Sequence, residues 1–445
     1  MRTSPTVKRI FICASILFYG TSLFAQQDSL RLSIGKMFDL ALENSREIKL
    51  SKAYLSRAKS VIEDKTNSKL PGANLTTSAG YLSDAGVLGL GTMPSGFYPM
   101  PHFSNSYALQ ASALLYAGGR QETDIDIAKL EANLAELNVR KNTQTVKLIL
   151  VGYYLDLYQL YQQKIVYERN LSLSRELLGK INERYENGIA LKSDRIRNEL
   201  LVSSFELALS SLMDHIQIAN NNIVTTLALP EHMVVIPEEV IEISEIDKKL
   251  VWDAQERKEG SVLTSNLENQ EASLRIAVAD EKLKLTRSAN YPEISLFLSG
   301  AISRPYTFDI PAKDIYANTN AIGIKMNIPV SNFYLSRKKI DIASKEVSIS
   351  RLSKELTQEK VSRNVKNDYI KYREANSQLP TLYKQRELAD ENYRRITDNY
   401  MEQLALNTEV MDASNQKLEA DLRISKAKVQ IIYAYYQFLK TLGKL

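Results

Sequence analysis

The sequence predicts a mostly helical protein with a smaller β-portion, built from two copies of one unit. Three observations predict this class: an internal duplication, two long stretches almost free of proline, and four short segments of alternating apolar and polar residues. Residues 125–128 (Ile-Asp-Ile-Ala) reappear at 340–343, and Tyr185 reappears as Tyr400, both at an offset of 215. No insertion interrupts the match, so each copy is expected to be a rigid helical body of fixed length.

The N-terminus has the features of a secretory signal peptide over residues 1–25. Basic residues including Lys8 and Arg9 precede an apolar stretch from Ile10 to Phe24, and Ala25 offers a small residue for cleavage. This pattern predicts export from the cytosol. A retained membrane anchor is the alternative, although the apolar stretch is too short to span a bilayer.

Composition gives little support for an enzyme or a nucleic-acid-binding protein. The only cysteine, Cys13, lies in the predicted signal peptide and the three histidines are scattered, so no disulfide and no metal site are expected. No nucleophile elbow or glycine-rich phosphate loop is present, and we expect no catalytic residue and no cofactor. A net charge of +5 in 445 residues does not favour a nucleic-acid partner.

The distribution of proline predicts where the helices lie. No proline occurs between residues 102 and 229, and Pro380 is the only one after 330. Because proline is excluded from helix interiors, each half is expected to contain a helix, two strands, a very long helix and a further helix. Pro380 is expected to kink its helix passively. The predicted helices span 34–69, 121–186 and 192–228, and then 261–290, 338–402 and 407–441.

The duplication also divides the chain. We expect a first structural repeat over 26–230, a linker over 231–260 and a second structural repeat over 261–445. In each repeat the two shorter helices together nearly equal the long one, which would measure roughly 100 Å. This match favours a cylinder of parallel rods. The last helix of each repeat keeps heptad spacing, so an isolated antiparallel coiled coil is the alternative.

Four segments alternate between apolar and polar residues. Ile322, Ile324 and Met326, for example, alternate with Gly323 and Lys325. About ten residues of this pattern are typical of a transmembrane barrel strand, although a soluble sheet on a core would alternate too. Four strands cannot close a barrel, so closure would require several chains. The segments are 74–81, 107–115, 294–299 and 321–330, with loops 85–104 and 303–319 as the expected exposed tips.

The duplicated order of elements, together with the turn at residues 184–194, resembles the TolC-like outer-membrane efflux proteins. The resemblance covers the whole mature chain. It implies a homotrimer in which long α-helical hairpins form a periplasmic α-barrel and four strands per protomer contribute to a trimeric 12-stranded outer-membrane β-barrel. Residues 231–260 would form the equatorial linker.

The resemblance further implies a function and partners. The protein would be the outer-membrane channel of a tripartite efflux pump or type I secretion system, passively conducting substrates to the exterior. Its partners would be a periplasmic adaptor, an inner-membrane transporter and outer-membrane lipid. A periplasmic coiled-coil scaffold without a channel, or an adaptor, is the alternative.

In this family the entrance is closed where the helical hairpins turn. The resemblance carries a gate or selectivity ring to Asp194, Tyr400, Glu409 and Asp412. We hypothesise that Tyr400 hydrogen-bonds Asp194. The helix macrodipole alone also favours acids in a first helical turn, which is the structural alternative for Asp194 and Glu409.

The turns differ from the family pattern in two respects. Ala405 stands where the family often has an arginine, so Arg195 or Arg197 is the alternative contact that would close the entrance. Gln403 stands opposite Gly188. Ser193 and Thr408 are expected to be the N-caps of the helices that follow.

Apolar residues on these otherwise polar turns form a candidate docking surface for an adaptor. Ordinary packing within the turn is the alternative. The residues are Gly188, Ile189, Leu191, Leu404 and Leu406.

Overall fold

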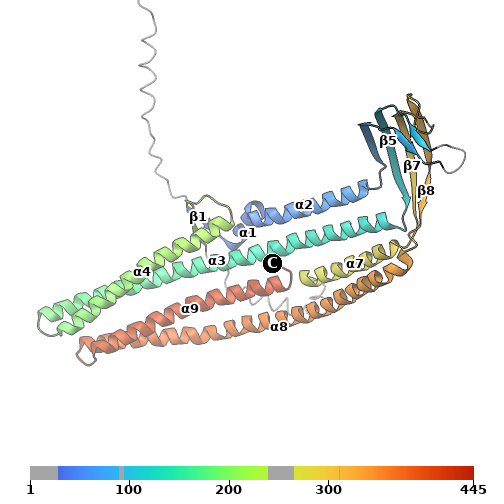
Figure 1. The fold of residues 1–445 in the computed structure, drawn as a ribbon. Coiled ribbons are helices and arrows are strands. Elements are labelled where there is room, and N and C mark those ends of the chain that lie inside the picture. Colours follow the sequence, from blue (N-terminus) through green and yellow to red (C-terminus); the bar gives the residue numbers. More distant parts are fainter. Residues whose placement is uncertain (1–28, 90–94, 239–264, 310) are drawn as a thin grey trace, which may run out of the picture. The chain divides into compact units, whose positions relative to one another are not determined.

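The computed structural model describes residues 29–89, 95–238, 265–309 and 311–445 (Figure 1). The predicted signal peptide and most of the predicted linker lie outside these residues. The chain divides into two compact units. The helical unit comprises Met1–Arg46, Val146–Asp253 and Tyr369–Gln437, and the sheet unit comprises Glu47–Thr145, Ala254–Asp368 and Phe438–Leu445.

The sheet unit contains a four-stranded antiparallel sheet in the order β2-β5-β7-β8 (Figure 1). Strands β5 and β7 pair in the middle, so the sheet joins the two halves of the sequence. Strands β2 and β8 are its edges. The strands are β2 (Gly72–Tyr81), β5 (Phe103–Tyr116), β7 (Glu293–Arg304) and β8 (Ala317–Asn327).

The strand register separates the sheet into an apolar and a polar face. Leu75 pairs with Leu109, and Leu298 pairs with Ile322, so these side chains share one face. The side chains of Leu75 and Ile322 are 70% and 72% exposed, so no part of the described chain covers this face. The opposite face carries mostly small and polar residues, although Phe297 also lies on it, and the hydroxyls of Ser78 and Ser106 share a 2.8 Å hydrogen bond there. The predicted alternation of all four strands is confirmed.

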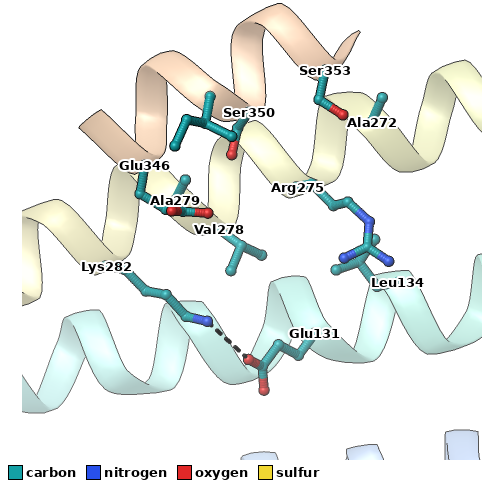
Figure 2. A pocket seen from close by; sticks show the side chains of 11 residues that line it. Glu131, Leu134, Ala272, Arg275, Val278, Ala279, Lys282, Glu346, Ser350 and Ser353 are labelled. Atoms are coloured by element: carbon teal, nitrogen blue, oxygen red, sulfur yellow. Dashed lines mark ion pairs between the residues drawn. The ribbon is translucent and has the colours of Figure 1, made fainter. Parts of the chain in front are cut away.

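The described helices that contribute to the sheet unit are α2 (Arg46–Asn67), α7 (Leu267–Ser288), the first parts of α3 (Arg120–Glu186) and α8 (Asn332–Met401), and the last residues of α9 (Asn407–Thr441). Helices α3, α7 and α8 enclose a hollow of about 340 Å³ (Figure 2). Lys282 of α7 reaches Glu131 of α3 across it, with 3.9 Å between Nζ and Oε1.

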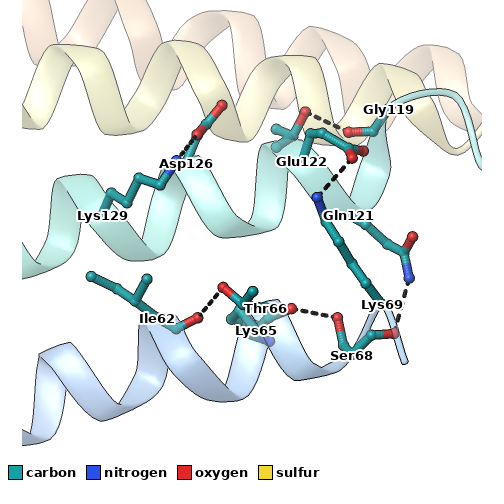
Figure 3. A network of polar contacts seen from close by, with 11 residues as sticks. Ile62, Lys65, Thr66, Ser68, Lys69, Gly119, Gln121, Glu122, Asp126 and Lys129 are labelled. Atoms are coloured by element: carbon teal, nitrogen blue, oxygen red, sulfur yellow. Dashed lines mark hydrogen bonds and ion pairs between the residues drawn. The ribbon is translucent and has the colours of Figure 1, made fainter. Parts of the chain in front are cut away.

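A polar network joins the end of α2 to the start of α3 (Figure 3). The ammonium of Lys69 lies 2.9 Å from the Glu122 carboxylate, and the Gln121 amide donates to the carbonyl of Ser68 at 3.0 Å. These contacts lie next to the first residues of β2, so they fix the direction in which the chain enters the sheet.

Several predicted boundaries are wrong. The predicted helix 34–69 is two helices, α1 (Ile34–Asn44) and α2, because Ser45 takes an extended ψ of 122°. The first residues of the predicted helix 261–290 lie outside the described residues, and within the described part α7 begins at Leu267, where the Asn266 side chain caps it. The loop 85–104 contains an unpredicted hairpin of β3 (Ala85–Val87) and β4 (Gly96–Tyr98). Residues 328–330 lie outside β8, and α8 starts before residue 338.

The helical unit contains a short parallel pair of strands, β1 (Ser29–Leu32) and β6 (Val234–Pro237). The hydroxyl of the buried Tyr154 lies 3.0 Å from the carbonyl oxygen of Leu32 and 2.9 Å from that of Glu238. The side chain of Asn220 accepts from the Val235 amide at 2.7 Å and donates to the carbonyl of Met233 at 3.0 Å. Two buried polar side chains therefore satisfy the backbone around this strand pair.

The helical unit also contains α1 and two helical hairpins: α3 with α4 (Lys192–Thr226), and α8 with α9 (Asn407–Thr441). Arg175 and Glu206 form an ion pair across the first hairpin at 2.7 Å. At the position that matches Glu206, Asp421 pairs with Arg386 at 2.8 Å across the second. Pro380 lies inside α8, and its predicted kink stays a prediction. No helix in the described part of the chain is long and apolar enough to cross a membrane.

We predict that Asn220→Ala destabilises the helical unit. The substitution leaves the Val235 amide and the Met233 carbonyl without their partners in a buried place, which costs roughly 2–3 kcal/mol of unfolding free energy. Thermal denaturation of the purified protein measures this loss. The neighbouring Asn221 is exposed, so Asn221→Ala is the matched control. Equal stability of the two variants would contradict the role of Asn220.

Candidate functional site

The two turns that close the helical hairpins have the same backbone geometry. Gly188 and Gln403, which match at the repeat offset, both adopt a left-handed conformation, with φ of 71° and 66°. The backbone amide of Ile189 donates to the carbonyl of Arg184, and the backbone amide of Leu404 donates to the carbonyl of Asn399, each at 2.8 Å. In the second turn, Gln403 therefore adopts the left-handed conformation that glycine usually adopts after the end of a helix.

The helices that follow these turns start differently from the expectation. The N-cap of α4 is Leu191, with no side-chain cap, and α9 begins at Asn407, directly after Leu406. Ser193 and Thr408, the expected N-caps, lie instead in the first turns. In α9 the Glu409 carboxylate accepts from the Leu406 amide at 3.0 Å, which is half of a capping box.

The structure brings Tyr400 and Asp194 together. The Tyr400 hydroxyl donates to Asp194 Oδ2 at 3.4 Å, linking the end of α8 to the first turn of α4. Tyr400 is buried in an apolar cluster with Leu177, Ile181 and Val410. Burial, followed by the negative charge of Asp194 and their hydrogen bond, raises the pKa of Tyr400. The hydroxyl therefore keeps its proton at physiological pH and stays a donor.

The other two candidate gate residues lie on α9, exposed. Glu409 is bonded to the start of its own helix, and Asp412 accepts from the side-chain amide of Gln416 at 3.2 Å. The contact of Glu409 is of the kind that the macrodipole alternative anticipates for this residue. Their place three residues apart still puts both carboxylates on one helix face.

The arginine that bridges the two turns is one that sequence reasoning missed. Arg184 donates from Nη1 to the carbonyl of Met401, the last residue of α8, at 2.7 Å. Arg195, which was one alternative, instead pairs with Glu199 at 2.9 Å and lies over the Tyr185 ring at 5.6 Å. Arg197, the other, is exposed. The only available signal was the position of Arg184 four residues before the left-handed Gly188.

The candidate docking residues are exposed on the turns. Ordinary turn packing, the alternative interpretation, would bury such side chains, yet each apolar member is more than half exposed: Ile189, Leu191, Leu404 and Leu406. Gly188 has open space around its Cα.

The hollow of the sheet unit offers no comparable chemistry. Its charged lining alternates in sign, with Glu131 and Glu346 against Arg275 and Lys282. Across the described residues, no cluster of histidine and acidic side chains has the arrangement of a metal site.

We predict opposite effects for two substitutions in the turns. Gly188→Ala has room for its methyl group but forces alanine into the left-handed region, which lowers the unfolding free energy by roughly 1 kcal/mol. Gln403→Gly removes the same strain and raises the unfolding free energy by up to about 1 kcal/mol. The greater entropy of the unfolded glycine chain offsets part of this gain. Thermal denaturation compares both with wild type. Destabilisation by Gln403→Gly would show that its side chain, and not its backbone, matters.

Comparisons with known proteins identify the family. The sequence profile of the outer membrane efflux protein family matches residues 37–228 and 260–444. No curated protein sequence matches the chain significantly.

Several solved structures share the fold. The outer-membrane channel OprN superposes with a TM-score of 0.75 at 16% identity, covering 93% of this chain and 90% of its own. The outer membrane protein VceC from Vibrio cholerae gives 0.74 at 14%, with 92% and 96% covered. The Campylobacter jejuni channel CmeC gives 0.72 at 13%, with 92% and 85% covered. Since the family description matches more than half of the residues, the chain belongs to the outer membrane efflux protein family.

Proposed function

We propose that this protein is a trimeric duct through the outer membrane, with a periplasmic extension, that works in a tripartite efflux pump or type I secretion system. The observation that carries this proposal is the four-stranded sheet, whose apolar face is exposed and whose edge strands β2 and β8 have no further partner among the described residues. An apolar outer face with a polar inner face is the pattern of a barrel strand in lipid.

Barrel closure supports assembly as a trimer. About eight strands are needed even for a filled barrel, so one chain cannot form a channel. Joining β8 of one copy to β2 of the next satisfies both open edges, and three copies in cyclic symmetry supply twelve strands. A periplasmic coiled-coil scaffold would instead leave the apolar sheet face in water.

The tip of the helical hairpins is the proposed gate. The Tyr400–Asp194 hydrogen bond and the Arg184–Met401 bond both link the first turn to the second within one chain. Three copies would also bring Glu409 and Asp412 around one axis. A ring of carboxylates at a constriction favours cations.

The exposed apolar residues of both turns are the proposed docking surface for a periplasmic adaptor. The adaptor would connect the duct to an inner-membrane transporter, which supplies the energy and selects the substrate. Conduction through the duct would then be passive, and the chain would perform no chemistry.

Extraction and conductance test the function together. The duct predicts trimers that leave the outer-membrane fraction only with detergent and that form ion-conducting channels in planar bilayers. A soluble scaffold predicts a protein that is extracted without detergent and gives no conductance, which would overturn the proposal.

We predict that Tyr400→Phe combined with Asp194→Ala opens the tip. The double variant removes the hydrogen bond and the charge near it, so single-channel conductance in planar bilayers is expected to rise several-fold. Tyr383→Phe is the matched control, since Tyr383 lies on the same helix and is partly exposed. Unchanged conductance of the double variant would sink the proposed role of this contact.

We also predict that Glu409→Gln with Asp412→Asn lowers the preference for cations. Glutamine retains an oxygen that accepts from the Leu406 amide, so the turn is expected to keep its shape while the charge is lost. Reversal potentials at low ionic strength measure the preference, because salt screens such charges. Glu419→Gln, farther along α9, is the control. If both variants select cations equally, the carboxylates do not line the constriction.

A further inference from the structure

Two asparagines from different hairpins meet in a buried place at the tip. Asn198 lies in the second turn of α4 and Asn407 is the first residue of α9, and their side chains are 1% and 3% exposed. The Nδ2 of Asn198 donates to the Oδ1 of Asn407 at 2.9 Å, across a separation of 209 residues. The contact therefore joins the starts of the two helices that follow the turns.

The pair is connected to the proposed gate through Asp194. The carbonyl oxygen of Asp194 accepts from Nδ2 of Asn198 at 2.8 Å and lies 3.4 Å from Nδ2 of Asn407. Its carboxylate accepts from Tyr400. Residues from α4, α8 and α9 thus converge on one residue, so displacing any of these helix ends disturbs the same set of hydrogen bonds.

The asparagine pair is not a feature that both repeats share. At the repeat offset, Asn198 matches Ala413 and Asn407 matches Lys192. Those two residues cannot form an equivalent hydrogen bond. The duplication therefore does not produce a second copy of this hydrogen bond within the chain.

The hydrogen bonding of the asparagine pair is incomplete. The Oδ1 of Asn198 is buried without a hydrogen-bond partner in the described structure. An unpaired buried acceptor is unfavourable, whereas water would pair it once the helices separate. The unpaired Oδ1 therefore offsets part of what the hydrogen bond between Asn198 and Asn407 contributes.

We propose that Asn198 and Asn407 form a latch that positions the two hairpins of one chain in the closed tip. This inference rests on the proposed function of the tip as a gate. Both are positioning residues, which act on the entrance through Asp194 and Tyr400.

The latch predicts that single substitutions shift the tip toward opening and that the double substitution reverses this shift. Asn407→Leu alone leaves Asn198 buried with an unmet amide hydrogen beside its unpaired Oδ1, so this variant shifts the tip toward opening by about fivefold or more in the open-to-closed ratio. Asn198→Leu removes that unpaired Oδ1 but leaves the Oδ1 of Asn407 unmet and breaks the bond between the helices, so it shifts the ratio the same way by a smaller factor. Leucine has the same number and branching of side-chain heavy atoms as asparagine, without its hydrogen-bonding groups. With both residues replaced, no polar group of the pair is left unmet, and the ratio returns to within about twofold of wild type.

Two measurements on the assembled trimer test the latch. The first is single-channel conductance in planar bilayers. The second is the distance distribution between spin labels attached at Ile189→Cys and Leu404→Cys, one on each exposed turn; these are the only label sites because the natural Cys13 lies in the predicted signal peptide. Asn415→Leu, at an exposed position of α9, is the matched control. The Tyr400→Phe and Asp194→Ala variant is the reference for an opened gate.

The outcomes separate the latch from the gate. Longer label distances in both single variants, restored in the double variant, support the latch. If the double variant equals the sum of the singles, or if the singles match Asn415→Leu, the latch is wrong even where the reference variant conducts more. If label distances change while no variant alters conductance, the latch holds and the proposed gate fails. Should a leucine variant not assemble, Asn407→Ser carries the same expectation in both measurements.

Discussion

The exposed apolar face of the four-stranded sheet is the constraint on which the other features depend. Leu75, Leu298 and Ile322 lie on that face, and nothing in the described chain covers them. Such a surface with two open edges is the basis of our proposal that the sheet faces lipid and that neighbouring copies pair with its edges. The pairing of β5 with β7 brings strands from both halves of the sequence into one sheet. A duplicated chain with one strand pair per repeat is therefore a direct way to build one segment of a closed barrel.

The assembly that we propose would require both repeats to keep one length, and the backbone conformations of the two repeats match even where the residues differ. Gln403 takes the left-handed conformation that Gly188 takes in the first repeat, and Ala228 takes the one that Gly443 takes at the end of the second. The backbone bonds also correspond, with the Leu229 amide donating to Val224 and the Lys444 amide to Leu439, each at 2.9 Å. Non-glycine residues in these places are strained, so packing along the helices must outweigh the strain.

The sequence allowed prediction of features that depend on short-range periodicity. Alternation with a period of two located all four main strands, and the absence of proline located both long helices. The Ser45 break and the β3–β4 hairpin were missed because neither has a strong local signal. The hydrogen bond from Tyr400 to Asp194 was anticipated because both residues lie at helix turns. Arg184 and the Asn198–Asn407 pair were missed, since in sequence they look like ordinary polar residues of helices, and only the apposition of the hairpins pairs them.

The chemistry of the tip differs from that of the hairpins for a physical reason. Farther from the turns, Leu171, Leu201 and Phe205 form an apolar core, and separating such a core exposes hydrocarbon to water without compensation. At the tip, hydrogen bonds through Arg184, Asp194 and the two asparagines join the hairpins in addition to the apolar cluster around Tyr400. Water can replace each of these bonds at small net cost once the helices move apart. An entrance that must close tightly and still open is better built from a few directional polar contacts than from additional leucine. In the gate that we propose, the polar contacts between the two turns are of that kind, and they stand beside the apolar cluster around Tyr400.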